Sequence, residues 1–226
     1  MPLRVLVLGE GKSEEGDGYY VPERPGQPFR EEDLGAAHVL VRRILVAHLG
    51  SEKPVFVYPP RLRTSRRPGN EGLISDLEGA PRLPTNPRHK GWLEACVGNN
   101  RVDLIVLLKD CKIDGQECGV DKVIEELGSA TAGRLPPGRT QVVKAGAKPS
   151  IEAWLLAHPE SDDISEKEAK SLLEATGWNR GDAPSIAGFA RIVDLAKLAA
   201  VCPEGFGRLV KDLRAAVEAC KVPSDR

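Results

Sequence analysis

The chain has 226 residues, of which 41% are hydrophobic and 29% charged, and its formal net charge is −1. This composition is typical of a globular protein with a buried core, and it excludes a strongly basic chain, although not a local basic groove. No apolar run approaches the ~18 residues of a membrane span, so we expect no membrane contact. The five cysteines are odd in number and irregular in spacing, which predicts the reduced thiols of a cytoplasmic protein rather than disulfides or a zinc site.

Up to about residue 149, short apolar runs alternate with helical patterns, which predicts an α/β domain with a mainly parallel sheet. Nearly continuous apolar runs indicate strands buried on both faces. Such runs predict strands over 3–8, 54–58, 103–108 and 140–144. Apolar residues at helical spacing predict helices over 31–49, 72–78, 91–97 and 119–127.

After Pro149 the pattern is helical throughout, with helices predicted over 151–157, 165–176, 185–198 and 203–219. Ser165 and Glu168 have the spacing of a capping box at the start of the second of these helices. We therefore expect an α/β core over 1–149, with a long basic loop at about 59–90, and a C-terminal helical region over 150–226 that packs on this core.

Acidic residues follow two of the predicted strands at the point where each strand ends. Glu10 and Glu14 lie in the turn after the first strand, and Asp110 and Asp114 follow the third. Ligands of an open parallel sheet bind outside the carboxyl ends of its strands. If the two strands are neighbours, Glu10 and Asp110 lie within reach of one ion, and Mg²⁺ commonly needs only one or two carboxylates. The alternative is that these acids are helix caps or solvated loop charges.

The long loop at about 59–90 combines prolines and glycines with many cations. Its basic residues are Arg61, Arg63, Arg66, Arg67, Arg82, Arg88, His89 and Lys90. Beside the acidic edge of the sheet, these side chains would bind the phosphate backbone of DNA or RNA without reading its sequence. The alternative is a solvated loop without a ligand.

Three segments resemble a known family. The turn EGKSE, which begins at Glu10, resembles the EG-x-[ST]-E turn of Toprim domains in OLD-type nucleases, and the strand DLIVLL before Asp110 resembles the strand that leads to their DxD motif. The segment KPSIEAWLLAH at 148–158 is similar to the P-x-[FI]-E-x-W-L-L-x-H segment of RloB-like proteins. These are small Toprim-like proteins linked to abortive infection and phage defence. The resemblance covers about residues 3–215 in order.

The resemblance implies a Toprim-like fold, in which a small parallel sheet is flanked by helices, here with a C-terminal helical appendage. The implied activity is hydrolysis of a DNA or RNA phosphodiester with Mg²⁺ or Mn²⁺. The metal ligands that it implies are Glu10, Glu14, Asp110, Asp114 and Glu152. Glu10 and Asp110 would act in catalysis as well, and Lys112 or Lys148 would neutralise the transition state. For Glu152, the alternative is a cap on the first turn of its helix.

One position departs from the family pattern. A DxD motif requires an acid two residues after Asp110, and this chain has Lys112 there. In one interpretation Asp114 reaches the site from the loop in place of the missing acid, and in the alternative Lys112 contacts phosphate and reduces the number of metals to one. A second interpretation is a catalytically decayed Toprim-like domain that serves as a binding subunit of an effector complex, for example with an ATPase. A third is a phosphatase that uses Asp110. A homodimer is compatible with each of them.

Overall fold

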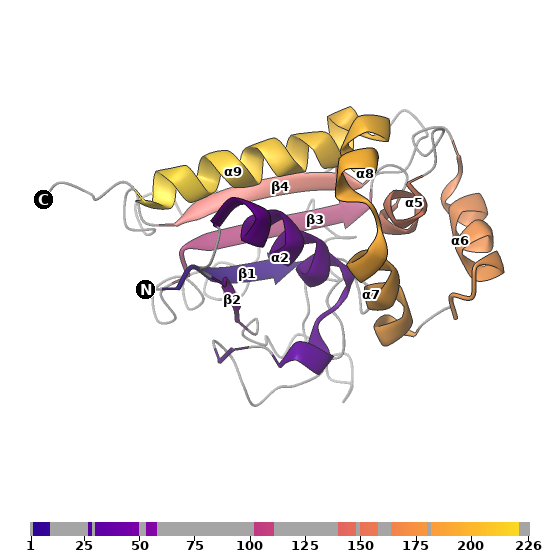
Figure 1. The fold of residues 1–226 in the computed structure, drawn as a ribbon, viewed down its shortest axis with the longest axis horizontal. Coiled ribbons are helices and arrows are strands. Elements are labelled where there is room, and N and C mark those ends of the chain that lie inside the picture. Colours follow the sequence, from indigo (N-terminus) through magenta and orange to yellow (C-terminus); the bar gives the residue numbers. More distant parts are fainter. Residues whose placement is uncertain are drawn as a thin grey trace, which may run out of the picture.

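The computed structural model describes residues 2–9, 27–28, 30–49, 53–57, 102–110, 140–147, 150–157, 164–179 and 182–221. These ranges form an α/β fold in which helices flank a small parallel sheet (Figure 1). The helices expected over 72–78, 91–97 and 119–127 lie outside the described residues. None of the described helices is both long and apolar enough to cross a membrane.

The sheet has four parallel strands in the order β2-β1-β3-β4. Its strands are β1 (Arg4–Leu8), β2 (Val55–Phe56), β3 (Leu104–Asp110) and β4 (Gln141–Ala147). Each of the four strands predicted from the sequence is therefore present. β1 and β3 are hydrogen-bonded neighbours, with Leu8 opposite Leu107. The prediction that Glu10 and Asp110 lie within reach of one ion required these two strands to be neighbours, and this condition is met.

Burial along the strands explains their places in the sheet. The first five residues of β3 are all buried, and Leu104, Val106 and Leu108 share a hydrophobic cluster with side chains of α2 and α9, while neighbouring strands pair with both edges of this central strand. β4 alternates instead, with Val143, Ala145 and Ala147 buried and the residues between them more exposed. This alternation is typical of a strand with one solvated face.

The helix predicted over 31–49 is in fact two elements. A 3-10 turn, η2 (Glu31–Asp33), precedes α2 (Ala36–Leu49). The helical path is interrupted because Leu34 has an extended backbone, with φ −71° and ψ 123°. α2 then connects β1 to β2 as a crossover and buries apolar residues of its first three turns against the sheet.

The C-terminal region contains α5 (Ile151–Leu156), α6 (Glu166–Ala175), α7 (Ala183–Ile192), α8 (Leu195–Val201), the π-helical turn η4 (Pro203–Gly207) and α9 (Arg208–Lys221). The prediction of one helix over 185–198 is wrong. The chain turns at Val193, and the Asp194 carboxylate accepts hydrogen bonds from the backbone N–H groups of Ala196 and Lys197, at 2.9 and 3.0 Å, so that a new helix begins. The predicted cap of α6 is confirmed, because Ser165 Oγ accepts from the Glu168 N–H at 3.2 Å.

Helices α2 and α9 lie over the same face of the sheet, and α7 packs on α2 (Figure 1). At the carboxyl ends of the strands, α5 is held by an aromatic contact. The rings of Trp154 and Phe206 are both fully buried and meet edge to face, with their centroids 5.4 Å apart. One hydrophobic cluster includes Trp154, Phe206 and side chains of β1, β3 and α9, so the strands and the C-terminal helices share a core.

Candidate functional site

The carboxyl ends of the strands face α5. β3 ends at Asp110, which is paired with Ala147, the last residue of β4. The chain that leaves β4 enters α5 after Ser150. The start of this helix is therefore beside the carboxyl end of β3, where ligands of parallel sheets bind.

Asp110 joins the sheet to α5 directly. The backbone N–H of Ile151 donates a hydrogen bond to Asp110 Oδ1 at 2.9 Å, across 41 positions of the sequence. Ser150, at the N-cap position, makes no side-chain capping bond of its own. A carboxylate near the first turn is favourable because the unpaired N–H groups of a helix carry partial positive charge there. Asp110 therefore points toward the first turn of α5.

Glu152 lies in that first turn and is only 3% exposed. Its Oε1 atom is 3.8 Å from Lys170 Nζ. Its Oε2 atom has no hydrogen-bond partner among the described residues, and the same holds for the hydroxyl of the buried Ser150. A carboxylate that leaves water without full compensation is costly, which is typical of a group kept for binding rather than for stability. Its place in the first turn is also the place that the alternative gives it, as a favourable charge at the positive end of the helix.

Lys170 of α6 supplies the positive charge near these two carboxylates. Its amine forms an ion pair with Glu166, one turn earlier in α6, and a second ion pair with Glu152 of α5. Burial alone would lower the pKa of the Lys170 amine, but the hydrogen bond to Glu166 and the charges of Glu152, Glu166 and Asp110 raise it above its ordinary value. We call Asp110, Glu152 and Lys170 the carboxylate site.

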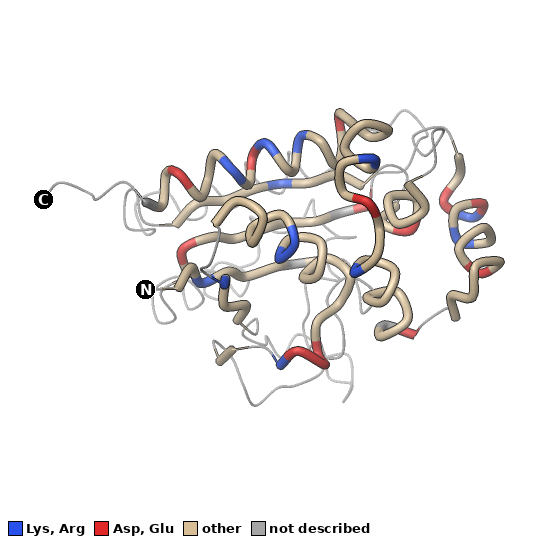
Figure 2. The backbone as a smooth tube through the Cα atoms, viewed as in Figure 1, with Lys and Arg blue, Asp and Glu red and all other residues tan. Residues whose placement is uncertain are grey.

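Lys170 was not found from the sequence. It lies 18 positions after Glu152, and its spacing from Glu166 is typical of an ordinary ion pair on a helix surface. In Figure 2, α6 carries both acidic and basic residues along its length, as a solvated helix does. Only the packing of α6 on α5 brings this amine to the buried carboxylate.

Of the site residues predicted from the sequence, the structure brings Asp110 and Glu152 together at α5. The other predicted ligands and catalytic residues lie outside the described residues: Glu10, Glu14, Lys112, Asp114 and Lys148. The same holds for the basic residues of the long loop: Arg61, Arg63, Arg66, Arg67, Arg82, Arg88, His89 and Lys90. Within the described ranges, no group of three or more His, Cys, Asp or Glu side chains is placed to hold a metal ion.

The residues present nevertheless fit a hard divalent cation. Carboxylate oxygens are its preferred ligands, and Mg²⁺ often takes only one or two of them together with water and substrate phosphate. Glu152 Oε2 is a buried oxygen atom with unused hydrogen-bonding capacity among the described residues, which is the state of a ligand before the ion binds. Asp110 would supply the second carboxylate at the same end of α5.

Comparisons with models of protein families, with curated proteins and with solved structures find no match to this chain. The function of the carboxylate site therefore has to follow from its residues. Two features are most informative: a strand-end aspartate and a buried glutamate meet at one helix, and the glutamate is only partly compensated.

Proposed function

We propose that this chain is a cytoplasmic, Toprim-like nuclease that hydrolyses phosphodiester bonds of DNA or RNA with Mg²⁺ or Mn²⁺ and takes part in phage defence. The observation that carries the proposal is the buried Glu152 carboxylate beside Asp110, with Oε2 lacking a partner among the described residues. The pairing of β1 with β3 supports it as well, because the turn that contains Glu10 begins directly after β1.

In this proposal Asp110, Glu152 and Glu10 hold the cation. A bound divalent ion would offset charge on a phosphate oxygen and activate a water molecule for attack. Lys170 holds Glu152 from the side of α6 and keeps a positive charge near the phosphate. Glu10 would accept the proton of the attacking water, and Lys112 and Lys148 would contact the phosphate.

One observation favours a second candidate, the decayed binding subunit of an effector complex. The Lys170 ammonium group already lies 3.8 Å from Glu152, where it provides part of the positive charge that a metal ion would provide. If Lys170 replaces the ion, the carboxylate site is structural and the protein acts through a partner such as an ATPase. This candidate predicts no saturable binding of Mg²⁺ or Mn²⁺.

Calorimetric titration with Mg²⁺ and Mn²⁺, together with nicking of supercoiled plasmid and cleavage of labelled single-stranded RNA, tests the proposal. We expect Asp110→Asn and Glu152→Gln to weaken metal binding by about tenfold or more and to abolish cleavage. Glu168→Gln is the matched control, because this side chain is exposed on α6. Absence of metal binding to the unaltered protein would favour the decayed subunit, and undiminished cleavage by both variants would contradict the proposed site.

A further inference from the structure

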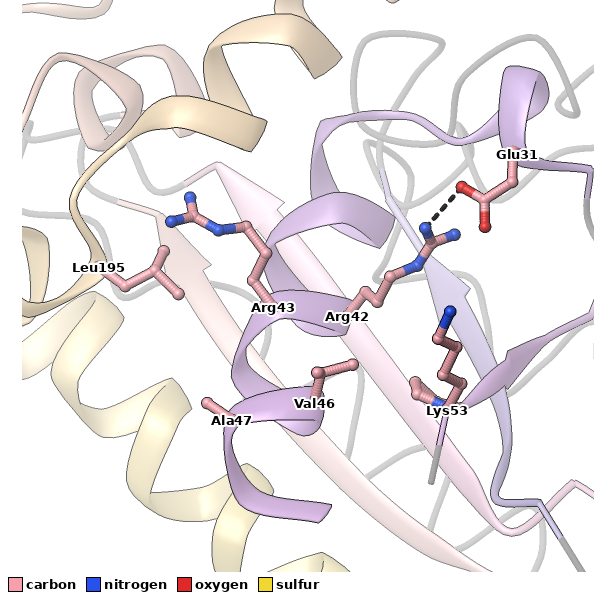
Figure 3. A pocket seen from close by; sticks show the side chains of 8 residues that line it. Glu31, Arg42, Arg43, Val46, Ala47, Lys53 and Leu195 are labelled. Carbon is pink, nitrogen blue, oxygen red and sulfur yellow. Dashed lines mark hydrogen bonds and ion pairs between the residues drawn. The ribbon is translucent and has the colours of Figure 1, made fainter. Parts of the chain in front are cut away.

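A hollow of about 560 Å³ lies on the outer side of α2 (Figure 3). Its walls come from η2, α2, the residues before β2 and the start of α8. The residues that line it are Glu31, Arg42, Arg43, Val46, Ala47, Lys53, Pro54 and Leu195. We call these residues the α2 hollow. Of them, Pro54 alone is buried, and the other seven are half-buried or exposed, so the hollow is open to solvent.

The α2 hollow carries more positive than negative charge. Three of its residues are cations and one is an acid. Arg42 is held in place by a 2.6 Å hydrogen bond to Glu31, and its guanidinium carbon lies 5.8 Å from the centre of the Phe56 ring. The exposed Lys53 has no ion pair among the described residues. Among the lining residues, positive charge therefore exceeds negative charge by two, although Asp194, outside the lining, lies near one of these cations, Arg43.

Arg43 lies on the other side of the hollow, with Val46 between it and Arg42 (Figure 3). Its Nη1 group donates to the backbone oxygens of Ala190 and Val193, at 2.9 and 2.7 Å. Burial lowers the pKa of this guanidinium group, and the nearby Asp194 opposes the shift. Because the side chain is already fixed, it would lose little conformational entropy when it binds a carboxylate.

Aliphatic side chains lie beside these cations. Val46 and Leu195 are half-buried, and Ala47 is exposed in the hollow. Aliphatic contacts surrounded by arginines are typical of protein–protein interfaces.

We propose that the α2 hollow binds an acidic segment of a partner protein in which carboxylates flank an aliphatic side chain. The excess positive charge selects for carboxylates, and the aliphatic side chains of the hollow select for an aliphatic residue beside them. A nucleic acid fits less well, because no aromatic side chain of the described residues lines the hollow for base stacking. A small molecule would remain largely in water in so open a hollow, whereas typical small-molecule sites bury ~70–90% of their ligand.

The inference goes beyond the proposed nuclease activity, because the α2 hollow shares no residue with the carboxylate site. Its test is selection of a phage-displayed library of short random peptides on the full chain. We expect selected peptides in which Asp or Glu flanks Leu, Ile or Val. One selected peptide, carrying a fluorescent label, is then titrated with the protein and its variants, and its affinity is expected to fall with rising salt.

Two variants alter the hollow without a burial cost, because both positions are exposed: Lys53→Glu and Ala47→Glu. We expect each to weaken peptide binding by about tenfold or more, which is ~1.4 kcal/mol. The matched controls are Lys211→Glu on α9 and Ala200→Glu on α8, both exposed and outside the hollow, and we expect them to bind as the unaltered protein does. Failure to enrich acidic peptides, equal affinity in all four variants, or stronger competition by oligo-dT than by the peptide would overturn the proposal.

Discussion

The carboxylate site and the α2 hollow hold their charges in opposite ways. Glu152 is almost completely buried, and one amine at 3.8 Å is its nearest ion partner among the described residues. Arg42 and Arg43 are half-buried, and each is held by a close hydrogen bond to a carboxylate or to backbone oxygens. A buried carboxylate whose charge is only partly compensated is suited to binding a metal ion. Arginines held in place beside aliphatic side chains are suited to binding a protein partner.

The difference between the two regions also ranks the expected effects of substitutions. Water screens the exposed charges of the hollow, so a single charge there is worth at most about 1 kcal/mol of folding free energy. At the carboxylate site, water is excluded from Glu152, and the removal of a partner leaves a charge that nothing else compensates. Substitutions at the carboxylate site should therefore change the folding free energy more than substitutions in the α2 hollow.

The largest effect is expected for Asp110→Asn, which removes the strand-end charge at α5. If the carboxylate site is catalytic, metal-dependent nicking should fall by ~100-fold or more, as for the loss of other electrostatic groups in active sites. Asp182→Asn is the control, because this aspartate is exposed and makes no side-chain capping bond. Initial rates of plasmid nicking measure both. Equal rates for the two variants would place catalysis elsewhere.

A smaller effect is expected for Lys170→Met, which leaves the buried Glu152 without its ion partner. The free energy of unfolding should fall by about 2 kcal/mol in urea titrations at neutral pH, since an uncompensated buried group costs ~1–3 kcal/mol. The raised pKa of Lys170 means that the amine stays charged, and this stabilisation persists until the pH rises beyond the ordinary pKa of 10.5.

Two controls sharpen the Lys170 measurement. Lys167→Met makes the same change at an exposed position of α6 and should leave stability nearly unaltered. In the Glu152→Gln background, the loss caused by Lys170→Met should shrink, because there is no buried charge left to compensate. An equal loss in both backgrounds would mean that the two side chains do not interact.

Gly205→Ala tests the packing that holds α5 in place. A Cβ atom at position 205 would lie 3.2 Å from Trp154 Cζ2 and 3.4 Å from the backbone oxygen of Gly146, so one of these groups must move. We expect a loss of about 1 kcal/mol in the free energy of unfolding. Gly188→Ala on α7 is the matched control: its Cβ meets no atom within 4 Å, and alanine should stabilise this helix by ~0.5–1 kcal/mol. Thermal unfolding measures both variants, and an equal fall in their melting temperatures would contradict this expectation.

The smallest expected effect is the pH dependence that comes from Cys220. Burial, rather than an ion pair, governs the ionisation of its thiol. Burial, with a smaller contribution from Asp103, raises the pKa of its thiol from an ordinary value of 9.0 to about 11. Only the thiolate reacts with iodoacetamide, so alkylation of Cys220 should reach half its maximal rate near the higher value in the folded protein. The unfolded chain ionises first, so the thiol should also reduce stability as the pH rises from about 9 to about 11. Peptide mass spectrometry across pH, with a urea-unfolded control, measures the alkylation.

Local patterns in the sequence account for most of the elements in the described ranges. The unbroken apolar run of β3 predicts a central parallel strand, and Ser165 with Glu168 predicts the start of α6, because both signals depend on residues a few positions apart. The same reasoning missed the break between α7 and α8. An aspartate inside an amphipathic pattern is compatible with a solvated helix face, and only the turn at Val193 makes Asp194 a cap.

The candidate sites divide in the same way. The position of Asp110 at the end of a strand follows from the apolar run before it, whereas the pairing of β1 with β3 was a condition of the sequence argument that the structure meets. The burial of Glu152, the approach of Lys170 and the clamp of Arg43 on α7 join residues far apart in the chain. These contacts depend on how α5, α6 and α7 pack. Burial of apolar side chains determines where these helices lie, and the positions of the helices determine which charged side chains meet.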